Sequence, residues 1–114
     1  MPIEEVIEVY LNSTAGAVKI LSGFISSSSD ADFIMKAVVL LMNTEEQAEN
    51  NIESLEVTYY APELVKECRS SFLESNKAVI AHLEKFQLHG YHFENLIHAL
   101  KLENKTLSEE IHFA

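Results

Sequence analysis

The sequence predicts an all-α protein, an antiparallel up-down-up-down four-helix bundle that forms a single domain over residues 1–114. Three observations lead to this prediction. Apolar residues recur in alternating steps of four and three, as they do along one face of a helix. Serines, Ala61-Pro62 and Gly90 divide this pattern into four segments joined by short turns, which favours antiparallel neighbours. No segment of useful length alternates apolar and polar residues as a half-buried strand does.

The first helix is expected over about residues 2–25. Pro2 suits the first helical position, and the next turn is acidic, which the helix dipole favours. The predicted core seam is Ile3, Ile7, Tyr10, Thr14, Ala17, Leu21 and Phe24. Further apolar residues flank this seam and widen the apolar face, namely Val6, Leu11, Val18, Ile20 and Ile25.

The second helix is expected over about residues 30–60 and has the strictest pattern. Its seam is Ile34, Val38, Leu41, Glu45, Ala48, Ile52, Leu55 and Tyr59. Ser29 is the expected N-terminal cap, and Pro62 ends the segment because the residue before a proline avoids helical backbone angles.

The third and fourth helices are expected over about residues 62–89 and 91–112. Pro62 opens the third helix, and Gly90 suits the left-handed turn at its end. The prediction covers long helices that are either continuous or kinked at mid-helix. The alternative is a set of shorter helices, because Thr44 with Gln47 and Thr106 with Glu109 resemble capping boxes.

The seam of the third helix is Val65, Cys68, Phe72, Asn76, Val79, Leu83 and Phe86, and that of the fourth is Phe93, Ile97, Leu100, Asn104, Leu107 and Ile111. Each of the four seams has one polar member near its midpoint: Thr14, Glu45, Asn76 and Asn104. Midpoints of antiparallel helices meet at one level, so these four side chains are a candidate polar layer that could bind a small polar ligand or a cation. The alternative is that the helices bend here and the side chains reach water or cap the backbone.

The net charge is −10, from 18 acidic and 8 basic residues. This charge excludes the basic footprint that nucleic-acid binding requires, and an anionic membrane surface would repel the chain. Four glutamates form a stripe beside the seam of the second helix: Glu46, Glu49, Glu53 and Glu56. The stripe is a candidate binding site for another protein with a basic surface, although a solvated helix face gives the same pattern.

The first half of the second helix is apolar nearly all round. Phe33, Met35, Val39 and Leu40 lie off its seam, and Lys36 is the one charged residue between Asp32 and Glu45. A helix of this kind is either central or covered by another chain. These four residues are therefore candidates for self-association, and a homodimer is a possible partner state.

Metal, cofactor and membrane functions receive no support from the sequence. Cys68 is the single cysteine, which excludes a disulfide framework and fits a cytoplasmic protein. Glu109 and His112 form the one Glu-x-x-His pair, so a di-metal bundle lacks its ligands. The acidic start has no signal-peptide pattern, and the longest apolar run is too short to span a bilayer. We expect no cofactor, no metal and no membrane span.

No motif in the chain specifies a reaction, so an enzyme is the less favoured expectation. The sequence favours a small acidic helical module that binds another protein, in the manner of an inhibitor, an immunity protein, an antiactivator or a chaperone. The alternative is a bundle that binds a small ligand or a cation, with or without enzymatic activity, through the mid-bundle polar layer.

Overall fold

A computed structural model describes residues 2–87, 90 and 92–113. It contains four helices, α1 (Ile3–Ser26), α2 (Ala31–Thr58), α3 (Pro62–Gln87) and α4 (Glu94–Phe113). No residue in the described ranges is assigned to a strand. The prediction of an all-α four-helix bundle is confirmed.

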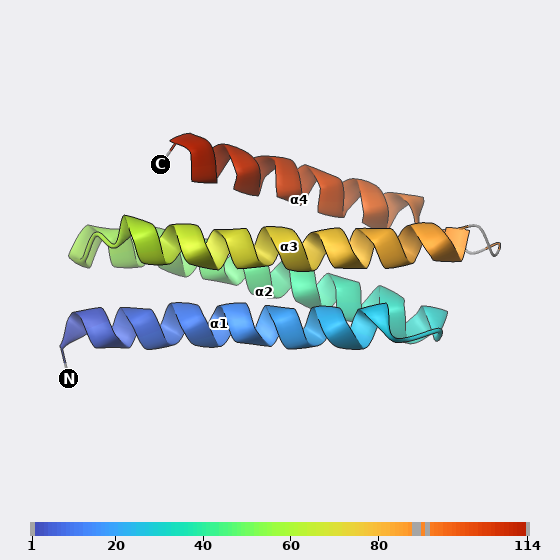
Figure 1. Ribbon diagram of the computed structural model, residues 1–114, viewed down its shortest axis with the longest axis horizontal. Coiled ribbons are helices and arrows are strands. Elements are labelled where there is room, and N and C mark those ends of the chain that lie inside the picture. Colours follow the sequence, from blue (N-terminus) through green and yellow to red (C-terminus); the bar gives the residue numbers. More distant parts are fainter. Residues whose placement is uncertain (1, 88–89, 91, 114) are drawn as a thin grey trace.

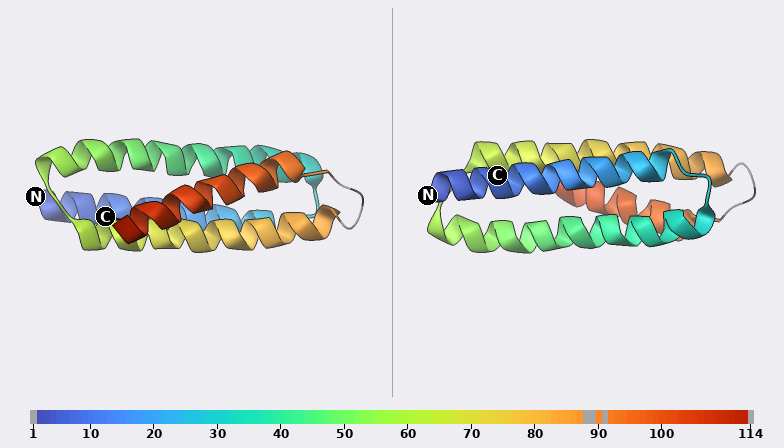
Figure 2. Two further views of the ribbon diagram at one scale, coloured as in Figure 1. Left: turned by 90° about the horizontal axis from the view of Figure 1, so that it is seen from above. Right: turned by 90° about the horizontal axis from the view of Figure 1, so that it is seen from below.

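Consecutive helices run in opposite directions along an elongated molecule of 50 × 27 × 16 Å (Figure 1). Figure 1 shows α3 between α1 and α4, with α2 behind. In Figure 2, α4 crosses from the α2 side of the bundle toward the α3 side. The most extensive contact between described residues joins α1 to α3, two helices that run parallel. The contact between α2 and α4 is much smaller.

The close contact between α1 and α3 rests on small side chains. Ser22 Oγ donates a hydrogen bond to the Ser75 carbonyl at 2.9 Å. The Cys68 thiol donates a longer one to the Leu11 carbonyl, with 3.7 Å between sulfur and oxygen. Such bonds from a short side chain to the backbone of the neighbouring helix require that the two helices approach closely. This contact fixes which face of α1 enters the core.

The predicted seam of α2 is buried from Ile34 to Ile52, with Leu55 and Tyr59 half-buried. The predicted seam of α1 is partly wrong, because Ile3, Ala17 and Phe24 are exposed. The buried apolar residues of α1 are Ile7, which belongs to the predicted seam, and Leu11, Val18 and Ile25, which were predicted to flank it. The helix is turned about its axis relative to the prediction, because Leu11 and Ser22 must face α3.

α3 begins at Pro62 as predicted, and the other helix ends differ from the predictions by up to three residues. Asp30, rather than Ser29, caps α2, since its Oδ1 accepts hydrogen bonds from the backbone N–H groups of Asp32 and Phe33 at 3.1 and 3.3 Å. α2 ends at Thr58, where the chain becomes extended at Tyr59. Gly90 has the predicted left-handed conformation, with φ 91°.

α4 begins at Glu94, later than the predicted start at residue 91. Phe93 explains this difference, because its side chain is buried and stacks edge-on against Phe86 with ring centroids 6.0 Å apart. Its carbonyl then accepts the first helical bond, from the Ile97 N–H. The predicted ends at residues 89 and 91 lie outside the described residues.

Each helix is continuous through its midpoint, so the alternative of shorter helices is wrong. The hydroxyls of Thr14, Thr44 and Thr106 donate hydrogen bonds to the carbonyls four residues earlier, those of Tyr10, Leu40 and Leu102. A threonine bonded in this way lies inside a helix and does not cap a new one.

Candidate functional site

Three of the four predicted polar-layer residues meet at the centre of the bundle. Asn76 of α3 donates from Nδ2 to Glu45 Oε1 of α2 at 2.7 Å and to Asn104 Oδ1 of α4 at 3.0 Å. Glu45 and Asn76 have no exposed surface, and Asn104 is half-buried. Thr14 forms its hydrogen bond within α1, to the Tyr10 carbonyl. The bonded group therefore joins α2, α3 and α4.

Burial raises the pKa of Glu45 from its ordinary value of 4.5 to about 8. The hydrogen bond from Asn76 acts against this shift, and the carboxylates of Glu103 and Glu49 add to it. Two buried oxygens in this group, Glu45 Oε2 and Asn76 Oδ1, have no hydrogen-bond partner among the described residues. Protonation of Glu45 would turn one of its carboxylate oxygens from an acceptor into a hydrogen-bond donor. The neighbouring Asn76 amide still has a free acceptor, its Oδ1. The arrangement suits a neutral carboxyl group.

The acidic stripe lies on the flank of α2 that faces α4. Glu46, Glu53 and Glu56 are exposed. Glu49 is occupied, since both of its carboxylate oxygens bind Arg69 of α3, through Nε at 3.0 Å and Nη2 at 2.8 Å. Glu103 of α4 is half-buried beside this stripe, and its pKa is raised by burial and by the carboxylates of Glu49 and Glu46.

Arg69 is the functional candidate that the sequence reasoning missed. It is only 5% exposed, and its guanidinium also lies 3.7 Å from a carboxylate oxygen of Glu110 in α4. The hydrogen bond to Glu49 raises the pKa of Arg69 above its ordinary value. Two features of the sequence could have identified it. Arg69 is the single arginine of the chain, and it directly follows Cys68, which lies on the predicted seam of the third helix.

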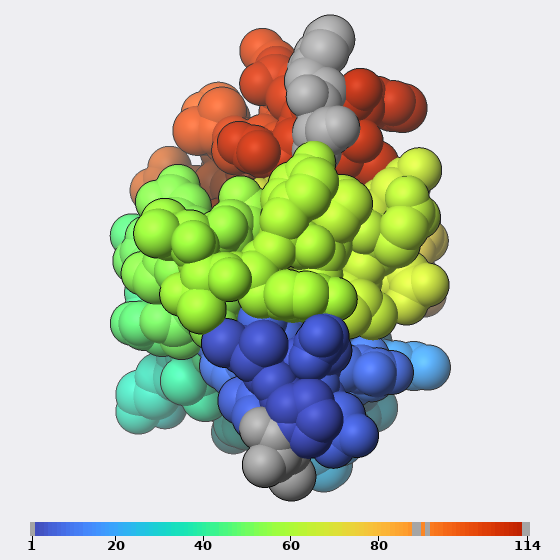
Figure 3. Space-filling model, turned by 90° about the vertical axis from the view of Figure 1, so that its left-hand side faces the viewer, coloured from blue at the N-terminus to red at the C-terminus, as the bar shows by residue number. Residues whose placement is uncertain are grey.

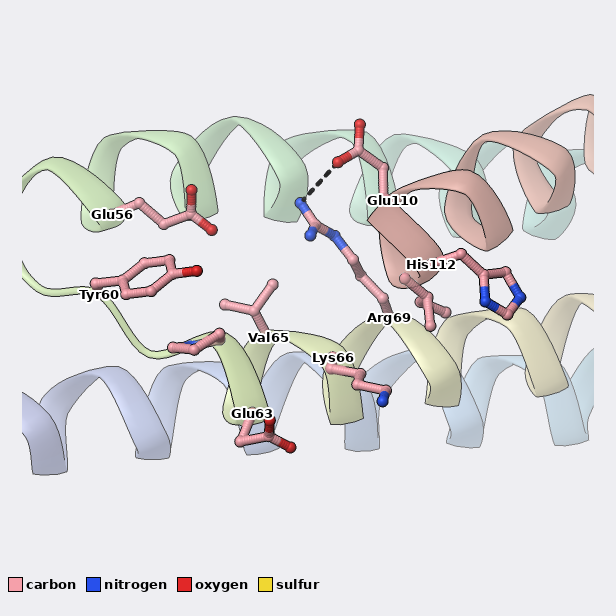
Figure 4. Close-up of a pocket in the computed structure, with 10 residues that line it drawn as sticks. Glu56, Tyr60, Glu63, Val65, Lys66, Arg69, Glu110 and His112 are labelled. Atoms are coloured by element: carbon pink, nitrogen blue, oxygen red, sulfur yellow. Dashed lines mark ion pairs between the residues drawn. The ribbon is translucent and has the colours of Figure 1, made fainter. Parts of the chain in front are cut away.

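A pocket of about 270 Å³ opens beside Arg69, where α2 ends, α3 begins and α4 ends. Figure 3 shows this end of the molecule, with the α2–α3 connection between the start of α1 and the end of α4. In Figure 4 the Glu56 carboxylate and the Tyr60 hydroxyl point toward the Arg69 guanidinium. The pocket is lined by Glu56, Tyr60, Pro62, Glu63, Val65, Lys66, Arg69, Glu110, Ile111 and His112. Since Glu49 and Glu110 already balance Arg69, the lining carries an excess of negative charge.

The four predicted self-association residues are exposed, Phe33 by 40%, Met35 by 46%, Val39 by 50% and Leu40 by 56%. The structure divides them between the two flanks of α2. Leu40 lines a hollow at the α1–α2 junction, and Ile20 and Phe24 of α1 line the same hollow. Met35 lies two residues from Phe33 and falls on the opposite flank, because a helix turns by about 100° per residue.

No metal centre is indicated, because no three His, Cys, Asp or Glu side chains in residues 2–87, 90 and 92–113 are placed to hold a metal ion. In the same residues, no helix combines the length and apolar character needed to cross a membrane. Comparison of the chain with protein-family models, with curated proteins and with solved structures found no match in any of the three.

Proposed function

We propose that the protein is an interaction module that binds another protein through an acidic surface formed by α2 and α4. This acidic surface consists of Glu46, Glu53, Glu56, Glu103 and Glu110. Arg69 lies beneath it and is buried, bonded to Glu49 and 3.7 Å from Glu110, so it leaves the other four carboxylates uncompensated. Such a surface favours a partner with a basic surface and speeds their encounter.

The pocket beside Arg69 gives this surface an anchoring point. Its volume of about 270 Å³ is below the range of roughly 300–1,000 Å³ that is usual for small-molecule pockets, so it suits a single side chain. The carboxylates of Glu56 and Glu110 attract a cation, and the Tyr60 ring can stack against one. We infer that a lysine or arginine side chain of the partner enters this pocket.

The acidic surface leaves the biological class of the module open. An inhibitor, an immunity protein, an antiactivator and a chaperone-like protein all act by binding one partner in this way, and the partner's identity distinguishes among them. A cytoplasmic location belongs to the same proposal and rests on the single, unpaired Cys68. The overall negative charge argues against nucleic acid as the partner.

The alternative function is a small ligand or cation held by the polar layer. One observation favours it, namely the unpartnered oxygens of Glu45 and Asn76. A proton satisfies both oxygens without further ligands, whereas a metal ion requires a group of acidic, histidine or cysteine side chains that the described residues do not provide. The interaction module is therefore the better-supported function.

The test replaces the exposed part of the stripe in the triple variant Glu46→Gln, Glu53→Gln and Glu56→Gln. Glu49 is retained because Arg69 depends on it. A matched control carries the same change of charge elsewhere, as Glu5→Gln, Glu8→Gln and Glu67→Gln. The wild-type and control proteins should both capture one basic protein from a lysate of the native host, and the stripe variant should not.

Binding kinetics with the purified partner complete the test. The association rate constant of the stripe variant should fall by about tenfold or more, and its dependence on salt should flatten. Thermal unfolding should stay unchanged, since the replaced side chains are exposed. A stripe variant that associates as fast as the control would refute binding through the acidic surface.

A further inference from the structure

The outer surface of α1 and α2, opposite the acidic surface, carries no net charge along two helical stripes. The α1 stripe is Val6, Tyr10, Ser13, Ala17, Ile20 and Phe24, and the α2 stripe is Phe33, Leu40, Thr44, Gln47, Asn51 and Ser54. Lys36 lies on the same side of α2, between Phe33 and Leu40, and its charge is paired with Asp32 at 3.0 Å. We call these two stripes the uncharged face. This composition is unusual in a chain with 18 acidic and 8 basic residues. The charge is therefore strongly segregated.

Two hollows run along the uncharged face. One of about 410 Å³ is lined by Ile20, Phe24 and Leu40 among others, and one of about 260 Å³ by Val6, Tyr10 and Asn51 among others. In the lining of the smaller hollow, Asn51 Nδ2 donates a 2.6 Å hydrogen bond to the Tyr10 hydroxyl, which joins α1 to α2. The face is thus hollowed, free of net charge, and bridged by a hydrogen bond between its two helices.

We propose that two copies of the chain pair through the uncharged face, and that the dimer presents two acidic surfaces to its basic partners. The second clause rests on the proposed function. Each copy carries a net charge of −10, so two copies can approach closely only through a face without charge. A basic partner would gain nothing electrostatically from this face. Two-fold pairing lets a single patch cover itself.

The size of the uncharged face matches what a dimer requires. α1 has 24 residues, so it extends roughly 36 Å at about 1.5 Å per residue, and two neighbouring helices are roughly 20 Å wide. The resulting area of roughly 700 Å² is close to the ~800 Å² that each partner buries in a standard interface. Ile20, Phe24 and Leu40 are 64%, 61% and 56% exposed, so their burial would provide the apolar centre.

The two surfaces lie on opposite flanks of α2. Leu40 and Thr44 belong to the flank toward α1, and Glu46 and Glu49 belong to the flank toward α4. Pairing through the uncharged face therefore leaves both acidic surfaces open. A dimer of this kind is bivalent, and a partner with two basic sites, or an array of partners, would be held more tightly than by a monomer.

Sedimentation at roughly 1–100 µM tests the pairing with two matched variants. Leu40 and Leu102 are 56% and 57% exposed, and Leu40→Glu and Leu102→Glu change the charge equally. The wild-type protein and Leu102→Glu should form dimers with similar dissociation constants. Leu40→Glu should weaken the dimer about tenfold or more, because it places two carboxylates in the interface. Ile20→Glu, on α1, serves the same purpose if Leu40→Glu does not fold.

The dependence on salt separates this proposal from the proposed function. Added salt should strengthen the dimer, because it screens repulsion between two acidic chains, but it should weaken binding of a basic partner. A wild-type protein that remains monomeric at the highest concentration overturns the pairing. So does an equal effect of the two leucine variants. A wild-type protein that forms the dimer but binds no basic partner would count against the acidic surface alone.

Discussion

The two flanks of α2 differ in the charge of the residues that they expose. One flank faces α4 and carries the glutamate stripe above the buried Arg69. The other faces α1 and carries Phe33, Leu40 and Thr44, without a charge. The buried seam from Ile34 to Ile52 separates the two flanks. A single helix thus supplies one half of two surfaces with opposite chemistry.

This difference shows that composition alone is a poor guide to what each surface can bind. The net charge of −10 describes the whole chain, yet the flank toward α1 contributes nothing to it. Long-range attraction of basic molecules belongs to the α4 side, and close apolar contact belongs to the α1 side. Variants that act on one flank and spare the other are the most direct way to test this division.

The largest effect is expected for the seam itself. Leu41 is fully buried and its neighbour Leu40 is 56% exposed. Because both residues are leucine, the same substitution at each compares the seam with the uncharged flank. Leu41→Ala should lower the free energy of unfolding by roughly 2–5 kcal/mol, through lost burial and the cavity that remains. Leu40→Ala should change it by less than about 1 kcal/mol. Urea unfolding measures both, and equal losses would show that the seam is misassigned.

The seam of α2 could be predicted because the residues beside it are polar over half its length, so a single apolar stripe fits. α1 contains two apolar stripes that satisfy the same spacing, one through Ala17 and Phe24 and one through Leu11 and Val18. Spacing alone cannot choose between them. The choice is made by the contact with α3, where Ser22 reaches the Ser75 carbonyl. The α1 half of the uncharged face was missed because Phe24 was assigned to the core, whereas its α2 half includes Phe33 and Leu40, two of the predicted self-association residues.

The polar centre was partly predictable, because the midpoints of antiparallel helices meet. Glu45, Asn76 and Asn104 come together for that reason, whereas Thr14 satisfies its hydroxyl within its own helix. The pairing of Arg69 with Glu49 was not predictable in the same way. It depends on the rotation of α3 about its axis and on where α4 ends, and sequence spacing within one helix determines neither. The pocket beside Arg69 has the same origin.

The second effect concerns the acidic flank. Arg69→Met keeps most of the side-chain volume but leaves Glu49 without its counter-charge, among other carboxylates. The free energy of unfolding at pH 7 should fall by roughly 2–3 kcal/mol, as expected for lost charge-assisted hydrogen bonds at a buried site. Lys77→Met is the control, because the pair of Lys77 with Glu74 is exposed and should contribute at most about 0.5 kcal/mol. Similar losses in the two variants would mean that Arg69 contributes no more than a surface pair.

The last effect is expected at Glu45, on the seam between the flanks, and it has the opposite sign. The folded pKa of about 8 lies above the ordinary value of 4.5, so this group's contribution to stability is fully present below pH 4.5. It is lost as pH rises toward 8, because the unfolded chain releases the proton first. Glutamine cannot ionise, and its amide can accept from Asn76 Nδ2 and donate to Asn76 Oδ1. Glu45→Gln should therefore raise the free energy of unfolding by up to about 3 kcal/mol at pH 7 and leave it nearly unchanged near pH 4.

Urea unfolding across this pH range measures the effect at Glu45, with the exposed Glu53→Gln as the control for a simple loss of negative charge. The slope of stability against pH should flatten in Glu45→Gln and persist in Glu53→Gln. A clear loss of stability in Glu45→Gln at pH 7 would mean that Glu45 is ionised in the folded protein and bound to a cation. In that case the polar centre, rather than either flank of α2, would be the binding site of this protein.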